Sequence, residues 1–360
     1  MLIFDLKIRL FFKHYILIKL GNSMITKLDL ETIDKSGMHK VYDKWPEIAK
    51  RSYEFEWESL KYQNIDHIIF AGMGGSGSIG DIFSSILSKT KLHVSVVKGY
   101  VLPKTVDENS LVIVSSVSGN TVEALSILNQ GKKLNCNLIA VSSGGDIEKF
   151  CKFNNISYRK IKQFISPRAS LVSFVYSMLK ILEFILPITK KEIIESIESL
   201  EKIGIQISSN NLTDSNQALN LAQEISKTPL IYYPWGLQAA AIRFKNSLQE
   251  NAKIHVIVED VVEASHNGIV AWEKKSEVFP ILLQGQDDNT KTKERWEIFK
   301  TYFDGKKINY IEIVSIKGDI LSKLMCLMYL LDYTSIYKSV LSKTDPTPVK
   351  SIDFIKSRLG

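Results

Sequence analysis

Residues 67–77 read HIIFAGMGGSG, a short apolar run that ends in a cluster of glycines. A continuous apolar run of this length is typical of a strand buried on both faces, as in a parallel sheet. Beyond the glycines, apolar residues return at helical spacing, at Ile79, Ile82, Phe83, Ile86 and Leu87. This segment therefore predicts a strand, a glycine loop and a helix in succession, the repeating unit of an α/β fold.

The same alternation continues toward the C-terminus and occurs in two successive runs. The further predicted strands are 94–97, 111–114, 138–141, 230–233, 255–258, 279–283 and 310–314. The further predicted helices are 121–134, 169–186, 236–251 and 321–337. Because Pro280 has no N–H to donate, we expect strand 279–283 at the periphery of its sheet. The two runs predict two three-layer units, each a parallel sheet flanked by helices.

A boundary between the two halves is expected at the polar stretch SSNN, residues 208–211. We therefore predict a first domain over 24–207 and a second over 208–360. Residues 1–23 are apolar but are interrupted by charged residues, so no apolar run approaches the roughly 18 residues of a membrane span. They also lack a cleavage site of the kind that follows a signal peptide. An interfacial helix is one interpretation, and a poorly packed extension before a second methionine, Met24, is the one we prefer.

Composition narrows the class of protein. The chain has 360 residues, of which 45% are hydrophobic and 24% charged, as in ordinary globular proteins. The net charge of +7 is spread along the chain, which suits a small anionic ligand better than nucleic acid. The three cysteines, Cys136, Cys151 and Cys326, form no C-x-x-C pair. We therefore expect a cytoplasmic protein with neither a disulfide scaffold nor a metal site, and with no membrane or nucleic-acid partner.

The glycine loop satisfies the G-x-G-x-x-G pattern through Gly72, Gly74 and Gly77. In this context the pattern is compatible with a dinucleotide site. A dinucleotide site also requires an acidic residue at the end of the second strand. Here residues 98–100 read KGY, and Asp107 lies well into the next loop, which argues against a dinucleotide. The remaining interpretations are a binding loop for another anion and a turn needed only for tight packing of strand on helix.

A second loop favours the anion. Residues 115–121 read SSVSGNT, directly after a predicted strand and before a predicted helix. A hydroxyl-rich loop at a helix N-terminus is suited to binding a monophosphate. Capping of the helix by Ser118 or Thr121 is the alternative, and it needs one hydroxyl only. Both loops would lie at the carboxyl edge of one sheet, where ligands bind in this class of fold.

With these two loops in place, the chain resembles the sugar isomerase (SIS) domain of phosphosugar-binding proteins. Three further segments narrow the family: SPRAS at 166–170, KNSLQENAK at 245–253 and SHN at 265–267. With DPTPVK at 345–350, the chain from residue 24 to residue 360 resembles the bifunctional phosphoglucose/phosphomannose isomerases of archaea and some bacteria. It departs from the family pattern at Ser78, Val117 and Gly268.

The resemblance assigns roles to nine residues. It implies that Glu250 is the catalytic base, that His266 and Lys350 open the sugar ring, and that Arg168 stabilises an enediolate. It further implies that the phosphate is held by Gly75, Ser76, Ser116, Ser118 and Thr121. His266 is expected to enter the active site of a second subunit, so that a homodimer is required for activity. The alternatives are a solvated Glu250, a surface His266, a solvated Lys350 and an Arg168 in a surface ion pair.

The function implied is the reversible isomerisation of glucose 6-phosphate, and of mannose 6-phosphate, to fructose 6-phosphate, without metal or cofactor. Two other functions remain open: another phosphosugar isomerase of this fold, acting on an aminosugar or pentose phosphate, and a protein that senses a phosphosugar without catalysis. A sensor needs the phosphate loops but no base, so Glu250, His266 and Lys350 together favour an enzyme. Thr344 and Thr347 are candidates for setting the balance between the two hexoses.

Overall fold

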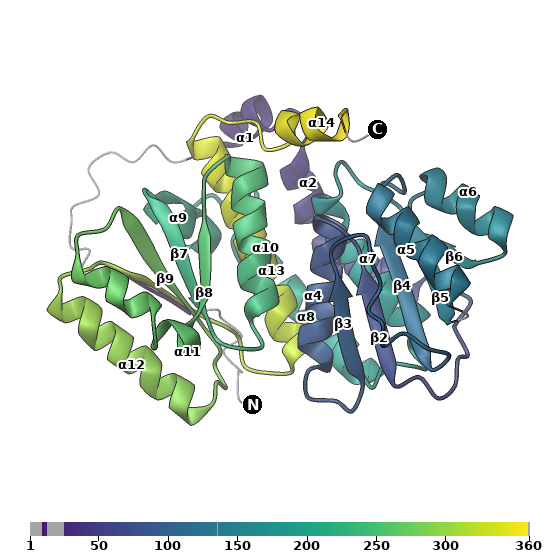
Figure 1. The fold of residues 1–360 in the computed structure, drawn as a ribbon. Helices are drawn as coiled ribbons and strands as arrows, with labels where there is room; N and C mark the ends of the chain where they lie inside the picture. The colour runs from purple at the N-terminus through teal and green to yellow at the C-terminus, as the bar shows by residue number, and fades with distance from the viewer. Residues whose placement is uncertain (1–8, 13–24, 135, 359–360) are drawn as a thin grey trace. The chain divides into compact units, whose positions relative to one another are not determined.

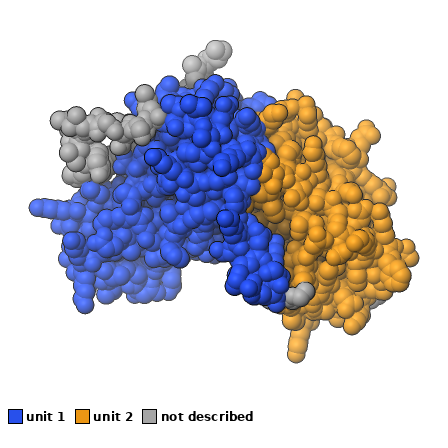
Figure 2. All heavy atoms as spheres, turned by 90° about the horizontal axis from the view of Figure 1, so that it is seen from above, with its two compact units in different colours: residues 1–43, 199–318, 325–360 blue, residues 44–198, 319–324 orange. Residues whose placement is uncertain are grey.

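The computed structural model describes residues 9–12, 25–134 and 136–358. The chain forms two compact units (Figure 2). Unit 2 consists of residues 44–198 and 319–324, and unit 1 of residues 1–43, 199–318 and 325–360. The units are thus not consecutive halves, because the chain begins in unit 1, passes through unit 2 and returns. The domain boundary at 207/208 stays a prediction.

Unit 2 contains a five-stranded sheet in the order β3-β2-β4-β5-β6 (Figure 1). Every pair of neighbouring strands is parallel. The strands are β2 (His67–Ala71), β3 (His93–Val97), β4 (Ser110–Ser116), β5 (Asn137–Ser142) and β6 (Ser157–Lys160). The parallel sheet predicted for the first run of alternating elements is confirmed, with β6 as an additional edge strand.

Helices cover both faces of this sheet. They are α3 (Trp45–Glu54), α4 (Gly75–Leu87), α5 (Val122–Lys133), α6 (Gly145–Asn154), α7 (Leu171–Ile181) and α8 (Lys190–Ile207), the last of which runs into unit 1. Successive side chains of β2 point to opposite faces of the sheet. Ile69 belongs to the apolar cluster that includes α5 and α6 residues, whereas the ring of Phe70 stacks on Phe83 of α4, 4.9 Å between centroids. The unit therefore has three layers, as predicted.

Unit 1 contains a second sheet, in the order β1-β10-β9-β7-β8. Its strands are β1 (Arg9–Phe12), β7 (Thr228–Tyr233), β8 (Ile257–Asp260), β9 (Val278–Gln284) and β10 (Ile311–Val314). β9 lies between β7 and β10, so the prediction of a peripheral strand was wrong. Pro280 is accommodated because β10 pairs with β9 only from Ile281 onward. At Pro280, the ladder therefore has a partner on the β7 side alone.

The helices of unit 1 surround this sheet. They are α1 (Lys27–Ile33), α2 (Met38–Asp43), α9 (Gln217–Glu224), α10 (Gln238–Ser247), α11 (Val261–Ala264), α12 (Thr290–Gly305), α13 (Ile320–Leu341) and α14 (Lys350–Lys356). Tyr232 of β7 packs with Trp272 and Phe303 in an aromatic cluster on the α12 side. α13 is buried along most of its length, which explains why its sequence is apolar all round.

The N-terminal segment differs in part from its prediction. Arg9–Phe12 form β1, which pairs antiparallel with the edge strand β10. These four residues are therefore a strand, not a helix or a poorly packed extension. They form hydrogen bonds with the backbone of β10, which would otherwise be an unpaired edge strand. The remainder of residues 1–23 lies outside the described part of the chain. Within the described ranges, no helix combines the length and the apolar character needed to span a membrane.

Two element boundaries also differ from their predictions. The helix predicted over 169–186 ends at Ile181, and tight turns carry the chain through Leu182–Leu186 to Pro187. The helix predicted over 236–251 is α-helical only to Ser247 and continues as one turn of π-helix, Leu248–Ala252. This turn and the left-handed Lys253 that follows it displace the next strand, which begins at Ile257 rather than at residue 255.

Candidate active site

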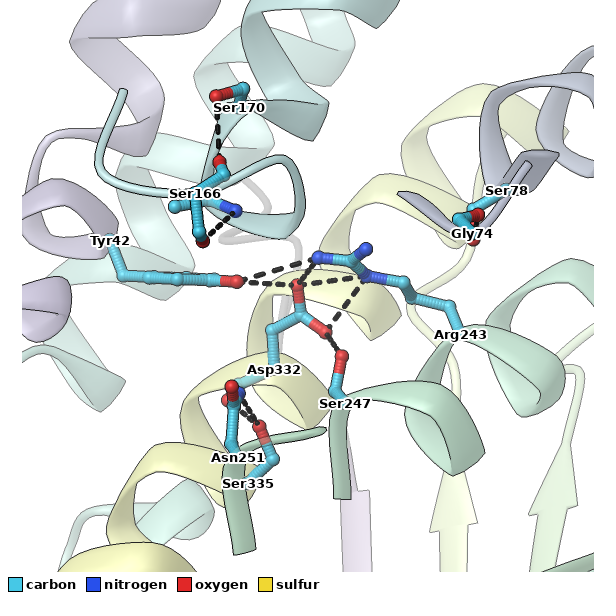
Figure 3. A network of polar contacts seen from close by, with 11 residues as sticks. Tyr42, Gly74, Ser78, Ser166, Ser170, Arg243, Ser247, Asn251, Asp332 and Ser335 are labelled. Carbon is cyan, nitrogen blue, oxygen red and sulfur yellow. Dashed lines mark hydrogen bonds and ion pairs between the residues drawn. The ribbon is translucent and has the colours of Figure 1, made fainter. Parts of the chain in front are cut away.

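The glycine loop of unit 2 packs against the loop that follows β4. A Cβ on Gly72 would lie 2.7 Å from Ser115 Oγ, so only glycine fits there. Gly74 has a φ of +53°, and its carbonyl accepts a hydrogen bond of 3.4 Å from Ser78 Oγ (Figure 3). At the end of β3, where a dinucleotide site wants an acid, Lys98 pairs with Asp81 at 2.6 Å. This charge disfavours the dinucleotide interpretation.

The hydroxyl-rich loop is joined to the glycine loop by direct hydrogen bonds. Val117 N donates to Ser76 Oγ at 3.0 Å, and Ser115 Oγ lies 3.3 Å from the carbonyl oxygen of Ser76. Val117 is buried, so its departure from the family pattern places an apolar side chain in the packed interior rather than on the surface. Ser76 and Ser116 are therefore held by neighbouring strands at the same sheet edge.

The hydroxyls do not cap α5. Thr121 occupies the N-cap position of α5, but its side chain makes no capping hydrogen bond among the described residues. Instead Thr121 Oγ1 lies 2.7 Å from Ser116 Oγ, which also accepts from Gly119 N at 3.1 Å. Ser118 is half-buried, 3.5 Å from the N–H of Asn120. The capping alternative thus fails for Thr121, and the first N–H groups of α5 stay available to an anion.

A third loop brings Arg168 to the same place. A Cβ on Gly75 would lie 3.4 Å from Pro167 O and 3.5 Å from Arg168 N, so this loop lies directly against Gly75. Ser166 fixes the loop: its carbonyl accepts from Ser170 Oγ at 2.8 Å, and its hydroxyl accepts from Ala169 N at 3.3 Å (Figure 3). Arg168 exposes only 2% of its surface, which excludes a surface ion pair.

Unit 2 therefore unites the predicted phosphate residues and Arg168 in one place. Three loops from the carboxyl edge of its sheet converge there, and they present hydroxyls, helix N–H groups and one buried guanidinium. Gly75, Ser76, Ser116, Ser118, Thr121 and Arg168 are the residues concerned. The other three predicted residues, Glu250, His266 and Lys350, lie in unit 1.

Glu250 lies half-buried in the turn of π-helix that follows α10. Such turns are rare and frequently mark functional sites. Two hydrogen bonds hold the turn around Glu250. Asn251 Nδ2 donates to Ser335 Oγ of α13 at 2.8 Å (Figure 3), and Lys253 Nζ donates to the backbone carbonyl of Glu250. The structure therefore fixes the backbone on which the predicted base is carried.

A buried ion pair supports the same turn. Arg243 of α10 contacts Asp332 of α13 at 2.7 Å, and Ser247 Oγ donates to Asp332 Oδ1 at 2.5 Å (Figure 3). Burial by itself would lower the pKa of Arg243, because it disfavours the charged guanidinium. The negative charge of Asp332, together with Tyr42 and Glu250, outweighs the effect of burial, so the pKa of Arg243 lies above its ordinary value. The carboxylate of Glu250 thus lies within the field of a buried positive charge.

This ion pair was not predicted, although the sequence contains a signal for it. Arg243 follows the run of alanines in α10, and Asp332 stands in the middle of α13, a long helix that is mostly apolar. A charged residue at a position that periodicity assigns to the core requires a partner of opposite charge. Two such core positions that carry opposite charges therefore predict a buried ion pair.

Lys350 is the first residue of α14, which begins shortly after the Asp-Pro-Thr-Pro segment. Its side chain is exposed. The segment before it is linked to the Glu250 turn, because Lys253 Nζ lies 3.5 Å from Pro346 O. Glu250 and Lys350 therefore belong to two segments that meet in unit 1.

His266 follows α11 and is exposed. Its backbone N–H donates to Glu263 O at 2.9 Å, which holds the turn and leaves the imidazole outward. No described contact joins His266 to Glu250. Gly268, two residues after His266, is one of the departures from the family pattern. A Cβ at this position would lie 2.2 Å from Glu259 Oε1, so only glycine leaves room for the Glu259 side chain. Burial and the neighbouring Glu263 raise the pKa of that carboxyl.

Within the described residues, no group of three or more histidines, cysteines, aspartates or glutamates is placed to hold a metal ion. The three cysteines are free thiols.

Comparison with known proteins agrees with these features. Residues 61–183 match the model of the SIS domain, and residues 214–359 match that of the bacterial phospho-glucose isomerase C-terminal SIS domain. A bifunctional phosphoglucose/phosphomannose isomerase of Caldicellulosiruptor bescii is 31% identical over 330 residues, which cover 88% of this chain and 96% of that protein. Another, from Aquifex aeolicus, is 28% identical and covers 85% and 95%.

Among solved structures, a putative tagatose-6-phosphate ketose/aldose isomerase from Clostridium novyi superimposes with a TM-score of 0.66. The match covers 91% of this chain and 95% of that one at 14% identity. At this identity the likeness concerns the fold alone, and it confirms the SIS type of both sheet-and-helix units.

Proposed function

Since the chain belongs to the family of bifunctional phosphoglucose/phosphomannose isomerases, we propose that it interconverts glucose 6-phosphate and mannose 6-phosphate with fructose 6-phosphate through an enediolate. The enzyme is an isomerase of the SIS type. The observation that carries the mechanism is the turn of π-helix around Glu250, whose neighbour Asn251 is bonded to Ser335 of α13. A sensor of phosphosugars would need no such turn.

The phosphate of the substrate is bound in unit 2. Ser118 and Thr121 stand at the open N-terminus of α5, where the helix presents unpaired N–H groups and the positive end of its dipole. Gly75 lets the backbone approach closely, and Ser76 and Ser116 complete the ring of hydroxyls. Lysine is absent from these loops, and the anion is held by neutral donors.

Glu250 acts as the base. It removes the proton from C2 of the open-chain aldose, which leaves a C1–C2 enediolate with its negative charge on O1. The O2 proton then passes to O1, and Glu250 returns its proton to C1, so that C2 becomes the carbonyl carbon of the ketose. The buried guanidinium of Arg168 is suited to the negative oxygen of the enediolate, because its charge is permanent and its environment is dry. Arg168 therefore contributes to rate more than to affinity.

Ring opening precedes proton transfer and requires an acid at O5. Lys350 and His266 serve this step, and both are exposed on the chain. We assign His266 to the active site of a second subunit, so that the homodimer is the active form. Its exposed imidazole on a fixed turn supports this assignment, since such a side chain is available to another chain. The three free thiols support a reducing compartment, the cytoplasm.

The decisive experiment supplies purified protein with glucose 6-phosphate and mannose 6-phosphate separately and follows the formation of fructose 6-phosphate. In D₂O, deuterium is expected at C1 of the product, because the transferred proton exchanges on a carboxylate. Binding of both sugars without turnover would instead indicate a sensor. Turnover restricted to glucosamine 6-phosphate or to a pentose phosphate would indicate a different isomerase of this fold.

A further inference from the structure

A cavity of about 450 Å³ opens on unit 2 and contains none of the phosphate-loop residues. It lies between α3, the segment 160–164 after β6, and α7. Its volume is in the range of sites that bind small molecules. The interior is formed by the buried side chains of Ile48 and Ile161 and by two serines of α7, Ser173 and Ser177. The cavity is therefore apolar at its base and has a few hydroxyls.

Aromatic rings line the opening. Phe55 and Trp57 lie with their ring centroids 4.6 Å apart, and Trp57 Nε1 donates to the carbonyl of Ser52 at 3.4 Å. Phe55 exposes 57% of its surface, so its ring is available to a ligand. Phe164 contributes a third ring to the lining. Rings so placed are suited to contact with a flat, apolar ligand group.

Charge at the rim is mostly positive. Four cations, Lys44, Arg51, Lys160 and Lys162, face one carboxylate, Glu47. Arg51 is paired with Glu47 at 2.6 Å, and Lys160 with Glu148 at 2.9 Å. Lys44 and Lys162 have no carboxylate partner among the described residues, and Lys162 Nζ lies 5.5 Å from the centroid of the Phe164 ring. The cavity therefore presents two uncompensated positive charges beside aromatic rings.

We propose that this cavity binds a small molecule that combines a flat aromatic ring with one anionic group, and that its occupancy affects Arg168. The ring contacts Phe55, Trp57 and Phe164, and the anion faces Lys44 and Lys162. The site is distinct from that of the sugar phosphate, whose contacts come from the loops after β2 and β4. The effect on Arg168 rests on the proposed function, whereas the binding itself does not.

The link to Arg168 is a short chain of hydrogen bonds. Phe164 N donates to Ser170 Oγ at 2.9 Å, and Ser170 Oγ donates in turn to Ser166 O at 2.8 Å. Arg168 lies within the turn that these two serines close. A ligand that moves Phe164 therefore changes the turn that orients the guanidinium.

The binding test uses two fluorescent probes that differ in charge alone. 8-Anilinonaphthalene-1-sulfonate carries an aromatic system and a sulfonate, and N-phenyl-1-naphthylamine is its neutral counterpart. We expect the sulfonate to bind saturably with one molecule per chain, and more tightly than the neutral probe. Equal affinity for the two probes, or binding without a defined stoichiometry, would overturn the proposal.

Matched variants locate the site. Lys44→Gln with Lys162→Gln is expected to weaken binding of the sulfonate roughly three- to tenfold and to leave the neutral probe unaffected. Lys89→Gln with Lys91→Gln removes the same charge from exposed lysines elsewhere in unit 2 and serves as control. Phe55→Ser is expected to weaken both probes roughly three- to tenfold, whereas Phe153→Ser, at a phenylalanine that is 89% exposed, is not. Equal effects of site and control variants would contradict the assignment.

The link to Arg168 is tested by activity. At a saturating concentration of the sulfonate probe, kcat for glucose 6-phosphate is expected to change by more than about twofold. In Phe55→Ser the same change is expected to require a probe concentration roughly three- to tenfold higher. A kcat that stays within that limit overturns the link. Isomerase activity that is absent from the start counts against the proposed function, while the binding titration still decides the site. Probe binding that appears only on dilution would show that a second copy of the chain covers the cavity, and would overturn the proposal.

Discussion

Arg243 Nη2 lies 2.7 Å from Asp332 Oδ2, and neither side chain exposes more than 2% of its surface. The pair connects α10 to α13, one turn before the π-helical turn of Glu250. A buried charge that loses its partner is strongly destabilising, because its desolvation is no longer offset. The pair therefore links the stability of unit 1 to the position of Glu250.

Asp332→Asn is expected to lower the free energy of unfolding by about 3–5 kcal/mol, as measured by urea denaturation. Glu277→Gln removes a partner of Lys227 from an exposed pair of 3.1 Å and is expected to cost at most about 1 kcal/mol. Replacing both members of the buried pair, by Arg243→Met with Asp332→Leu, is expected to recover most of the loss. If Asp332→Asn costs no more than the surface control, the pair does not stabilise the unit.

Glu250→Gln is expected to abolish turnover of both hexose phosphates while the fold survives. The amide is isosteric but accepts no proton from C2, and a positioned general base is worth roughly 10²–10⁴ in rate. Glu201→Gln, at an exposed glutamate of α8, is the control. Activity within about tenfold of the unmodified enzyme would remove Glu250 from the mechanism, provided that circular dichroism shows both variants folded.

Ser118→Ala combined with Thr121→Val is expected to raise KM strongly for both phosphosugars. A hydrogen bond to a charged group contributes about 1.5–3 kcal/mol, so the loss of two such bonds is expected to raise KM about 10²- to 10⁴-fold. kcat is expected to change less, because the phosphate is bound equally in ground and transition states. Ser126→Ala lies further along α5, where its hydroxyl donates to Tyr100 O, and tests whether any serine of this helix matters. An unchanged KM in the double variant would leave this loop without a role in binding.

Mixing two inactive variants tests the shared active site. If His266 enters the partner's site, a mixed dimer of Glu250→Gln and His266→Ala carries both lesions in one site and none in the other. With random exchange at equal input, about a quarter of all sites should recover activity. Mass-tagged subunits verify the exchange. Mixtures that exchange and yet stay as inactive as their parents would place His266 in the site of its own chain.

The free energy of unfolding should depend on pH through His67. Burial, together with the neighbouring His93, lowers the pKa of His67 below its ordinary value of 6.5. The two rings stack with centroids 4.3 Å apart at the paired starts of β2 and β3. Below pH 6.5 the unfolded chain binds a proton that the folded chain resists, so stability falls as the pH decreases.

His67→Gln is therefore expected to show a smaller loss of stability between pH 7 and pH 5 than the unmodified protein. Urea denaturation at several pH values gives the two slopes. His255→Gln, at an exposed histidine, controls for the loss of one imidazole. Identical slopes for His67→Gln and the unmodified chain would mean that His67 is not the group that titrates.

The alternation of strand and helix was predictable from sequence because it depends on local periodicity. The HIIFA strand, the glycine loop and the helix after it each carry their own signal in the spacing of apolar residues and in glycine. The hydroxyls of the loop after β4 were predictable for the same reason, since a strand that ends in serines before a helix has few other uses. Family motifs, rather than periodicity, identified Glu250, His266 and Lys350.

The place of the Pro280 strand in its sheet could not be predicted from local sequence. Its missing N–H is a local fact, but whether it costs a hydrogen bond depends on the residue at which β10 begins to pair, which is a property of the assembled sheet. The π-helical turn at Glu250 was equally hidden, because it results from bonds between Asn251 and Ser335 and between Ser247 and Asp332, more than 80 residues apart.

Local sequence patterns were enough to predict the class of fold, the order of its elements and a hydroxyl-rich loop before a helix. Tertiary structure was needed to show that Thr121 bonds to Ser116 rather than capping α5, that Arg168 is buried against Gly75, and that an ion pair supports the turn of Glu250. The reason is physical. Periodicity and turn chemistry act over a few residues, whereas hydrogen bonds and ion pairs between distant segments form only when packing brings their donors and acceptors together.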